Sequence, residues 1–323
     1  MSSASQNWIL WHKEAVMFEF SYDSVAELIR AAQEHGLSVS ELVLRQQAAQ
    51  LEKPAEEVYE TMRRSYEVMA QAAESGLQEG VRSASGLTGG DANRLHRHLQ
   101  ENGSLTEGLL PQALSIALAV SEWNAAMGRI VAAPTAGSCG ILPAALLTLQ
   151  RRRNLSEKAC VMALFTASGI GMVIARNASI SGAEGGCQAE CGSASAMAAA
   201  ALCELCGGTP AMIGHSVAIA LKNILGLVCD PVAGLVEIPC EKRNASGVAN
   251  AFVAAELALA GIESAIPVDE VILAMKRVGD ALPTALRETA EGGLAATPTA
   301  QALYEKVFGT AQTGCGGCRA CRS

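Results

Sequence analysis

The feature of this sequence that most restricts its fold is a long series of helical segments built from small side chains. From about residue 82 onward, glycine-rich turns separate stretches rich in Ala, Gly and Ser. Runs that alternate apolar and polar residues, as half-buried strands do, are scarce. The sequence therefore predicts an all-α domain whose chemistry lies on glycine-rich loops at helix ends. We expect helices at about 111–127, 140–149, 156–175, 193–206, 216–225, 244–262 and 268–282.

The N-terminal part predicts three amphipathic helices that form an outer layer. Ser38 followed by Glu41 has the capping-box spacing, in which side chain and backbone satisfy each other's N–H groups at a helix start. Asp23 or Ser24 can cap the preceding helix, which Gly36 would end. Pro54 suits the first turn of the third helix, which we expect to reach residue 76.

Composition limits the class of protein. Half of the residues are hydrophobic and only 4% are aromatic, so small side chains are expected to bring helices close together. The net charge of −8 argues against a nucleic-acid partner. The apolar run 159–175 is shorter than the roughly 20 residues of a membrane span, and we expect a buried core helix there. We divide the chain into a disordered extension (1–16), one catalytic domain (17–310) and a cysteine-rich tail (311–323).

Three of the eleven cysteines stand out by their surroundings. Cys187, Cys229 and Cys240 lie beside glycines or prolines, 42 and 11 residues apart, so distant loops must converge to bring them together. No secretory signal is apparent, which favours the reducing cytoplasm and metal ligation over disulfides. Three thiolates can hold three irons of a cubane cluster and leave the fourth iron open as a Lewis acid.

These segments resemble the catalytic (alpha) subunit of the iron–sulfur-dependent L-serine dehydratases, or L-serine ammonia-lyases. The resemblance rests on residues 85–90, 128–140, 177–190 and 230–244. It implies conversion of L-serine to pyruvate and ammonia, a 4Fe–4S cluster held by Cys187, Cys229 and Cys240, and no pyridoxal phosphate. No second domain is apparent in the chain, so the resemblance also implies a separate beta subunit.

The tail adds Cys315, Cys318 and Cys321 in a C-x-x-C-x-x-C pattern. The resemblance implies that a C-terminal cysteine ligates the open iron when no substrate is bound. Cys321 is the best match by position, with Cys318 as the alternative; a labile tail without this role is the other interpretation. The five remaining cysteines are expected to be mainly structural.

Two glycine-rich loops are candidates for holding the substrate carboxylate. Loop 85–90 and loop 134–140 offer hydroxyls and free N–H groups, and the second directly precedes a predicted helix. Neither has the Gly-Lys-Ser/Thr ending of a phosphate-binding loop. With the resemblance, the predicted substrate-binding residues are Ser85, Thr88, Gly89, Thr135, Gly137, Ser138, Asn177, Ser179 and Arg243.

Few groups are candidates for moving the α-proton. His215 can act as a base near neutral pH, although a histidine beside an apolar helix is more often simply hydrogen-bonded. Glu184 and Glu190 flank Cys187, and Ser181 lies in the same segment. Arg243 is either a substrate ligand or an ion-pair partner of Asp230. Another cluster-dependent lyase, such as a cysteine desulfidase, and a non-catalytic iron–sulfur sensor are the alternative functions.

Overall fold

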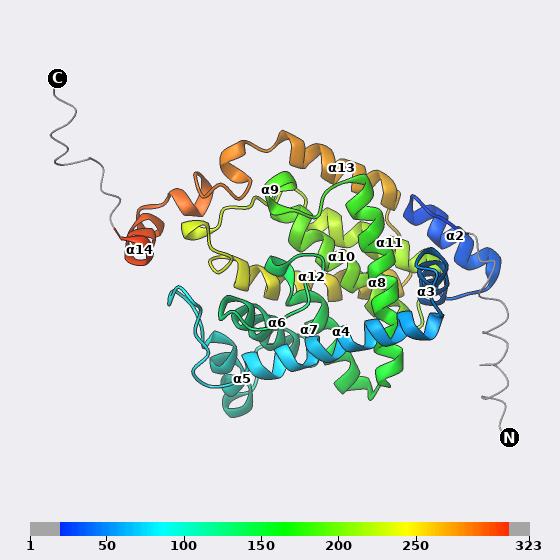
Figure 1. Ribbon diagram of the computed structural model, residues 1–323, viewed down its shortest axis with the longest axis horizontal. Helices are drawn as coiled ribbons and strands as arrows, with labels where there is room; N and C mark the ends of the chain where they lie inside the picture. The colour runs from blue at the N-terminus through cyan, green and yellow to red at the C-terminus, as the bar shows by residue number, and fades with distance from the viewer. Residues whose placement is uncertain (1–19, 310–323) are drawn as a thin grey trace.

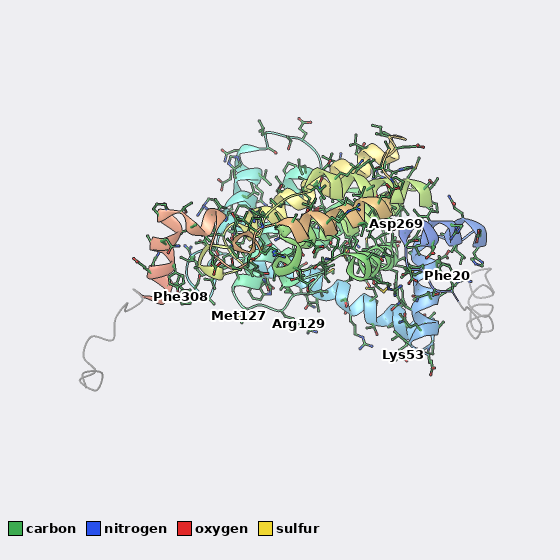
Figure 2. The ribbon with its side chains drawn as sticks, turned by 90° about the horizontal axis from the view of Figure 1, so that it is seen from above. Phe20, Lys53, Met127, Arg129, Asp269 and Phe308 are labelled. Atoms are coloured by element: carbon green, nitrogen blue, oxygen red, sulfur yellow. The ribbon has the colours of Figure 1, made fainter. Side chains whose placement is uncertain are left out.

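The computed structural model describes residues 20–309, and within them the fold is all-α, as predicted. The described residues contain no strand, only one isolated bridge between Cys229 and Arg287. The helices fold into a single elongated unit (Figure 1). Phe20 and Phe308 lie at its opposite ends when it is seen from above (Figure 2).

Capping residues in the sequence predicted the positions of the first helices correctly. Helix α2 (Val25–His35) begins after Ser24, whose hydroxyl accepts from the Glu27 N–H, and ends at Gly36 in the left-handed conformation. Helix α3 (Val39–Gln50) has the predicted capping box of Ser38 and Glu41. Helix α4 (Ala55–Gly76) is 22 residues long and packs across α3, α6 and α8.

The central helices are α6 (Leu110–Ala125), α7 (Ile141–Arg153), α8 (Glu157–Asn177), α10 (Ser193–Leu205), α11 (Pro210–Asn223) and α12 (Cys240–Leu259). Every residue of α10 up to Cys203 is buried, and α7, α8, α11 and α12 pack around it (Figure 1). Small side chains allow these helices to pack this closely. A Cβ added to Gly76 would lie 1.9 Å from the Ala119 carbonyl oxygen, so α4 and α6 touch backbone to backbone.

Helix α8 contains the apolar run 159–175. By length and composition it is the one helix among residues 20–309 that can cross a membrane, but 67% of its most apolar stretch is buried by other helices. Buried core helices meet the same criterion. The expectation of a core helix at 159–175 is therefore confirmed.

Two predicted helix starts were wrong. Helix α11 begins at Pro210 rather than at 216, because Thr209 accepts from the Met212 N–H and provides a better cap. Helix α12 begins at Cys240 rather than at 244. The predictions also missed α5 (Asp91–Asn102) and α14 (Pro298–Phe308), whereas α13 (Val268–Ala281) is close to its predicted position.

Candidate active site

The three singled-out cysteines converge in the fold. Cys187 follows the short helix α9 (Gly182–Gly185), Cys229 lies in the loop after α11, and Cys240 is the first residue of α12. Their exposed fractions are 2%, 3% and 7%, and none is in a disulfide. Burial raises the pKa of Cys229 and Cys240, and charge on Cys187 raises both further, so the three thiols lie within electrostatic range of one another.

This donor set fits a cluster better than a single ion. Within residues 20–309, no three His, Cys, Asp or Glu side chains stand close enough to hold one metal ion. A cubane instead takes one thiolate per iron, so its ligands stand further apart. Buried thiols with raised pKa values ionise only beside a cation, and a bound metal centre would be such a cation. Gly182 keeps the space beside Cys229 open, since a Cβ there would lie 2.8 Å from the sulfur.

A fourth cysteine lies beside this group. The Sγ atoms of Cys187 and Cys191 are 3.3 Å apart, one turn along the chain, and this contact lowers the pKa of Cys187. Residues Gln188–Gly192 form a π-helical turn, a rare conformation that is frequent at functional sites. Cys191 was expected to be structural, and its contact with Cys187 is visible only in the fold.

The first turns of α12 join two distant loops to Cys240. The half-buried Arg243 guanidinium donates to the Val228 carbonyl (2.9 Å) and pairs with Asp230 (2.8 Å), which fixes the Cys229 loop. The Asn244 amide accepts from the Gly140 N–H (2.9 Å) and donates to the carbonyls of Gly137 (2.6 Å) and Cys240 (2.9 Å). Adjacent residues of one helix thus hold both loops in register with Cys240.

The loop at 134–140 contributes a second polar group. Thr135 Oγ1 donates to Glu190 Oε1 and lies 3.1 Å from Ser138 Oγ. A Cβ on Gly137 would lie 2.5 Å from Glu190 Oε1, so the carboxylate packs directly on the glycine. Burial raises the pKa of Glu190, partly offset by the Thr135 hydrogen bond. The structure therefore brings the predicted residues Thr135, Gly137 and Ser138 together with Glu190, which also interacts electrostatically with the cysteines.

The loop at 85–90 is bonded to carboxylates of the protein itself. Ser85 and Thr88 donate to Glu237 (2.9 and 2.8 Å), and Thr88 also lies 2.7 Å from the Glu241 carboxylate. Gly89 has φ +121° and touches the backbone at Val81 and Arg82, which gives it a turn-forming role. The predicted substrate contacts of Ser85, Thr88 and Gly89 have no support in this geometry.

The free N–H groups of this loop are also taken. The backbone N–H groups of Gly90, Asp91 and Ala92, at the start of α5, donate to the fully buried Glu122 carboxylate. The loop does bind anions, as predicted, but those anions are carboxylates of the same chain.

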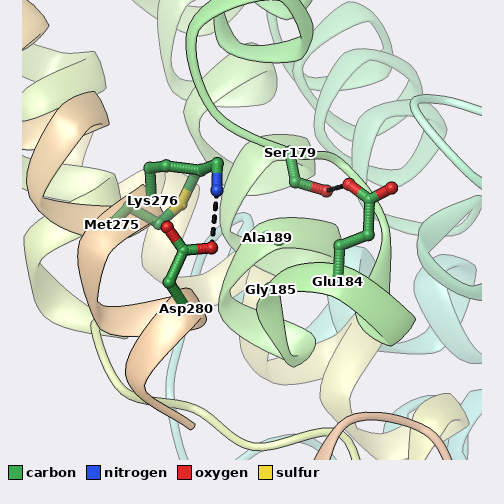
Figure 3. Close-up of a pocket in the computed structure, with 7 residues that line it drawn as sticks. All are labelled: Ser179, Glu184, Gly185, Ala189, Met275, Lys276 and Asp280. Carbon is green, nitrogen blue, oxygen red and sulfur yellow. Dashed lines mark hydrogen bonds and ion pairs between the residues drawn. The ribbon is translucent and has the colours of Figure 1, made fainter.

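Four predicted residues of the segment before Cys187 serve local structure. Ser181 caps α9 by accepting from the Ala183 N–H, and Asn177 donates to the carbonyls of Asp23 and Val173. Ser179 donates to Glu184 (2.7 Å), and both line a small pocket against Lys276 and Asp280 of α13 (Figure 3). Glu184 is exposed there and turned toward Ser179 (Figure 3). Their predicted functional roles gain no support from these contacts.

His215 has a structural partner. It lies in the first half of α11, and its Nδ1 accepts from the Ser264 N–H (3.1 Å) in the turn that leads to α13. The neighbouring Gly214 packs on Ile29 of α2, whereas the other end of α11 approaches the π-helical turn. No described interaction joins His215 to the cysteines or to Glu190. His215 therefore fits the alternative interpretation, in which the histidine has a structural hydrogen bond.

Other predicted residues have mixed outcomes. Arg243 forms the ion pair with Asp230 that was the alternative to substrate binding. Cys139, Cys160 and Cys203 are buried among the helices, as expected of structural cysteines. Cys315, Cys318 and Cys321 lie outside the described residues, and their predicted roles remain predictions.

Glu288 was not among the predicted site residues. This residue follows a short 3-10 turn (Thr284–Leu286), and its N–H donates to the Cys229 carbonyl (2.8 Å), while the Cys229 N–H donates to the Leu286 carbonyl (2.9 Å). No local pattern distinguishes Glu288 in the sequence, because its proximity to Cys229 exists only in the folded chain.

Comparisons with known proteins agree with the resemblance. Residues 34–295 match the family described as serine dehydratase alpha chain. The chain is 52% identical to the probable L-serine dehydratase, alpha chain, of Bacillus subtilis over 90% of its own length and 96% of that protein. It is 44% identical to the L-serine dehydratase, alpha chain, of Peptoniphilus asaccharolyticus over 87% of its own length and 96% of that protein. Against L-serine dehydratase 2 of Escherichia coli it is 41% identical over 85% of its length and spans 62% of that longer protein.

Proposed function

The chain belongs to the serine dehydratase alpha chain family, and on that basis we propose that it converts L-serine to pyruvate and ammonia as the alpha subunit of an L-serine dehydratase. The reaction eliminates water from L-serine to give aminoacrylate. Its imine tautomer then takes up water and releases ammonia. The observation that carries the proposal within the structure is the convergence of Cys187, Cys229 and Cys240 with the Thr135–Glu190 pair.

We propose that these three cysteines hold a 4Fe–4S cluster. When bound, the cluster supplies a Lewis-acidic iron that favours departure of the serine hydroxyl. The contacts of Arg243 and Asn244 set the distances between the ligand-bearing loops, and the low exposure of the three thiols limits access of water and oxidants. The cytoplasm, where thiols stay reduced, is the proposed location.

Glu190 is the residue that we propose for proton transfer, in place of His215 and Glu184. Burial raises its pKa, which makes its carboxylate a stronger base than an exposed glutamate. Thr135 donates to Oε1 and so leaves Oε2 as the oxygen able to take a proton. Ser138, beside the Thr135 hydroxyl, provides a further hydrogen-bonding group for the substrate.

We also propose a beta subunit as partner. The B. subtilis and P. asaccharolyticus relatives are named as alpha chains, whereas the longer E. coli relative carries additional sequence beyond the part that this chain spans. The name alpha chain implies a second, beta chain, and that chain is the proposed partner. Size-exclusion chromatography and pyruvate formation, with and without that second chain, test this; full activity of the alpha chain alone would contradict it.

The central experiment is anaerobic reconstitution with iron and sulfide. Cys187→Ser, Cys229→Ser and Cys240→Ser are each expected to lose bound iron and pyruvate formation from L-serine. Cys139→Ser, which changes an equally buried thiol, is the control and is expected to retain both. Unchanged iron content in the three variants would refute the cluster assignment. Sulfide released from cysteine in preference to pyruvate from serine would indicate a desulfidase, and a stable cluster without turnover would indicate a sensor.

A further inference from the structure

Glu288 adopts a backbone conformation that is unfavourable for its side chain. Its φ is +63°, in the left-handed region that residues other than glycine, asparagine and aspartate rarely occupy. The hydrogen bonds on either side of Arg287, to both backbone groups of Cys229, fix the residue in this conformation. The fold therefore holds Glu288 against a proposed cluster ligand at an energetic cost.

The carboxylate of Glu288 lies in the same small space as the Cys229 sulfur. A Cβ built on Gly182 would be 2.8 Å from Cys229 Sγ and 3.1 Å from Glu288 Oε2. Because glycine has no side chain, it leaves this space open to both groups. Glu288 is itself exposed, so its side chain is accessible from solvent, whereas Cys229 is buried.

A second carboxylate lies near Glu288. Charge on Glu288 raises the pKa of Glu190, so these two carboxylates repel one another. Arg243 is a cation near Glu190, but its guanidinium already binds Asp230 and the Val228 carbonyl. Among the described residues, no side chain forms an ion pair with Glu288.

We propose that Glu288 binds the ammonium group of the α-amino-acid substrate. This inference rests on the proposed function and names one contact within it. A substrate ammonium beside Glu288 would place a cation close to Glu190 as well, and would offset the repulsion between the two carboxylates. The same contact would select amino acids over hydroxy acids that lack the ammonium group.

The test compares two ligands that differ only in that group: L-serine and 3-hydroxypropanoate. In Glu288→Gln, which keeps the shape and removes the charge, the KM for L-serine is expected to rise about 10- to 100-fold, the loss typical of a charge-assisted hydrogen bond. The inhibition constant of 3-hydroxypropanoate is expected to stay the same or to fall. Iron content and the absorption spectrum should match those of the wild type. Glu291→Gln, an exposed glutamate of the same loop, is the control and should leave every value unchanged.

Three results would overturn the role of Glu288: an unchanged KM for L-serine, equal weakening of both ligands, or a loss confined to kcat. Failure of the wild type to form pyruvate would instead refute the proposed function. In that case L-serine is not consumed, and calorimetric titration of wild type and Glu288→Gln with L-serine and 3-hydroxypropanoate still tests the ammonium contact.

Discussion

Asn244→Ala is expected to be strongly destabilising, because one buried side chain supports two loops. Asn244 is fully buried and binds the Gly140 N–H and the Gly137 carbonyl, both of which are themselves buried. Each orphaned backbone group costs about 1–3 kcal/mol. We therefore expect a loss of about 4 kcal/mol in the free energy of unfolding. The third partner, the Cys240 carbonyl, is within a helix and adds little.

The assay is thermal unfolding of the iron-free, reduced protein, so that metal binding does not contribute to the measured stability. With an unfolding entropy of about 2.1 cal/mol/K per residue, the 323-residue chain should lose roughly 6 °C in Tm. Asn250→Ala is the matched control on the same helix. Its amide donates to Ala220 and accepts from Asn223 at a partly exposed position, so we expect a loss of only about 1 kcal/mol.

A comparable loss of unfolding free energy in Asn244→Ala and Asn250→Ala would refute the reasoning. It would mean that the buried Asn244 amide contributes no more to stability than a partly exposed one. In the iron-loaded enzyme, Asn244→Ala should also raise the KM for L-serine, since Gly137 and Thr135 move with the loop. A lower Tm with an unchanged KM would show that the loop keeps its position without this side chain.

Three further predictions follow from single contacts. Glu288→Gly should raise the free energy of unfolding in urea by about 1 kcal/mol, because glycine accepts the left-handed backbone, while L-serine affinity falls; a destabilised variant would contradict the strain. Thr135→Val should lower kcat/KM about 10- to 100-fold by removing the donor to Glu190, whereas Thr148→Val, at a buried hydroxyl without a partner, should have no effect. Glu204→Gln should be more stable than wild type at pH 7, because burial raises the pKa of Glu204 and the wild type loses stability as pH rises above the ordinary value of 4.5. Urea unfolding at pH 7 and pH 4 should show this difference shrinking at the lower pH.

Much of the helical fold was predictable from local sequence. The capping box at Ser38 and the glycine at 36 act within a few residues, so their outcome does not depend on the rest of the chain. The start of α12 was missed because residues 240–243 lack a side-chain cap; the interactions that hold this turn reach the Cys229 and Thr135 loops. Helix α5 was missed for a similar reason, since its capping carboxylate, Glu122, is about 30 residues away in the sequence.

Residue type gave the sharpest site prediction where few residue types can do the chemistry. Cysteines in glycine- and proline-rich loops indicate metal ligation, and the structure buries the Cys187, Cys229 and Cys240 thiols within electrostatic range of one another. Their role as cluster ligands stays a prediction. Hydroxyls and glutamates are common and serve many roles, so the sequence did not separate Thr135 from Thr88, or Glu190 from Glu184. Burial separates the two glutamates: Glu190 lies inside with the cysteines, and Glu184 lies on the surface beside α13. The two threonines differ in their partners, which are Glu190 for Thr135 and Glu237 with Glu241 for Thr88.

The loop at 85–90 shows that a loop with anion-binding groups can bind carboxylates of its own chain. Its hydroxyls and N–H groups do bind carboxylates, and these are the side chains of Glu122, Glu237 and Glu241. Glu237 and Glu241 flank Cys240 in the sequence, so their hydrogen bonds to Ser85 and Thr88 hold the start of α12 against this loop. Arg243 and Asn244 hold the same turn against the Cys229 and Gly137 loops. A loop that holds these carboxylates therefore positions a proposed cluster ligand, so substitutions at Thr88 are expected to act on iron retention before they act on serine binding.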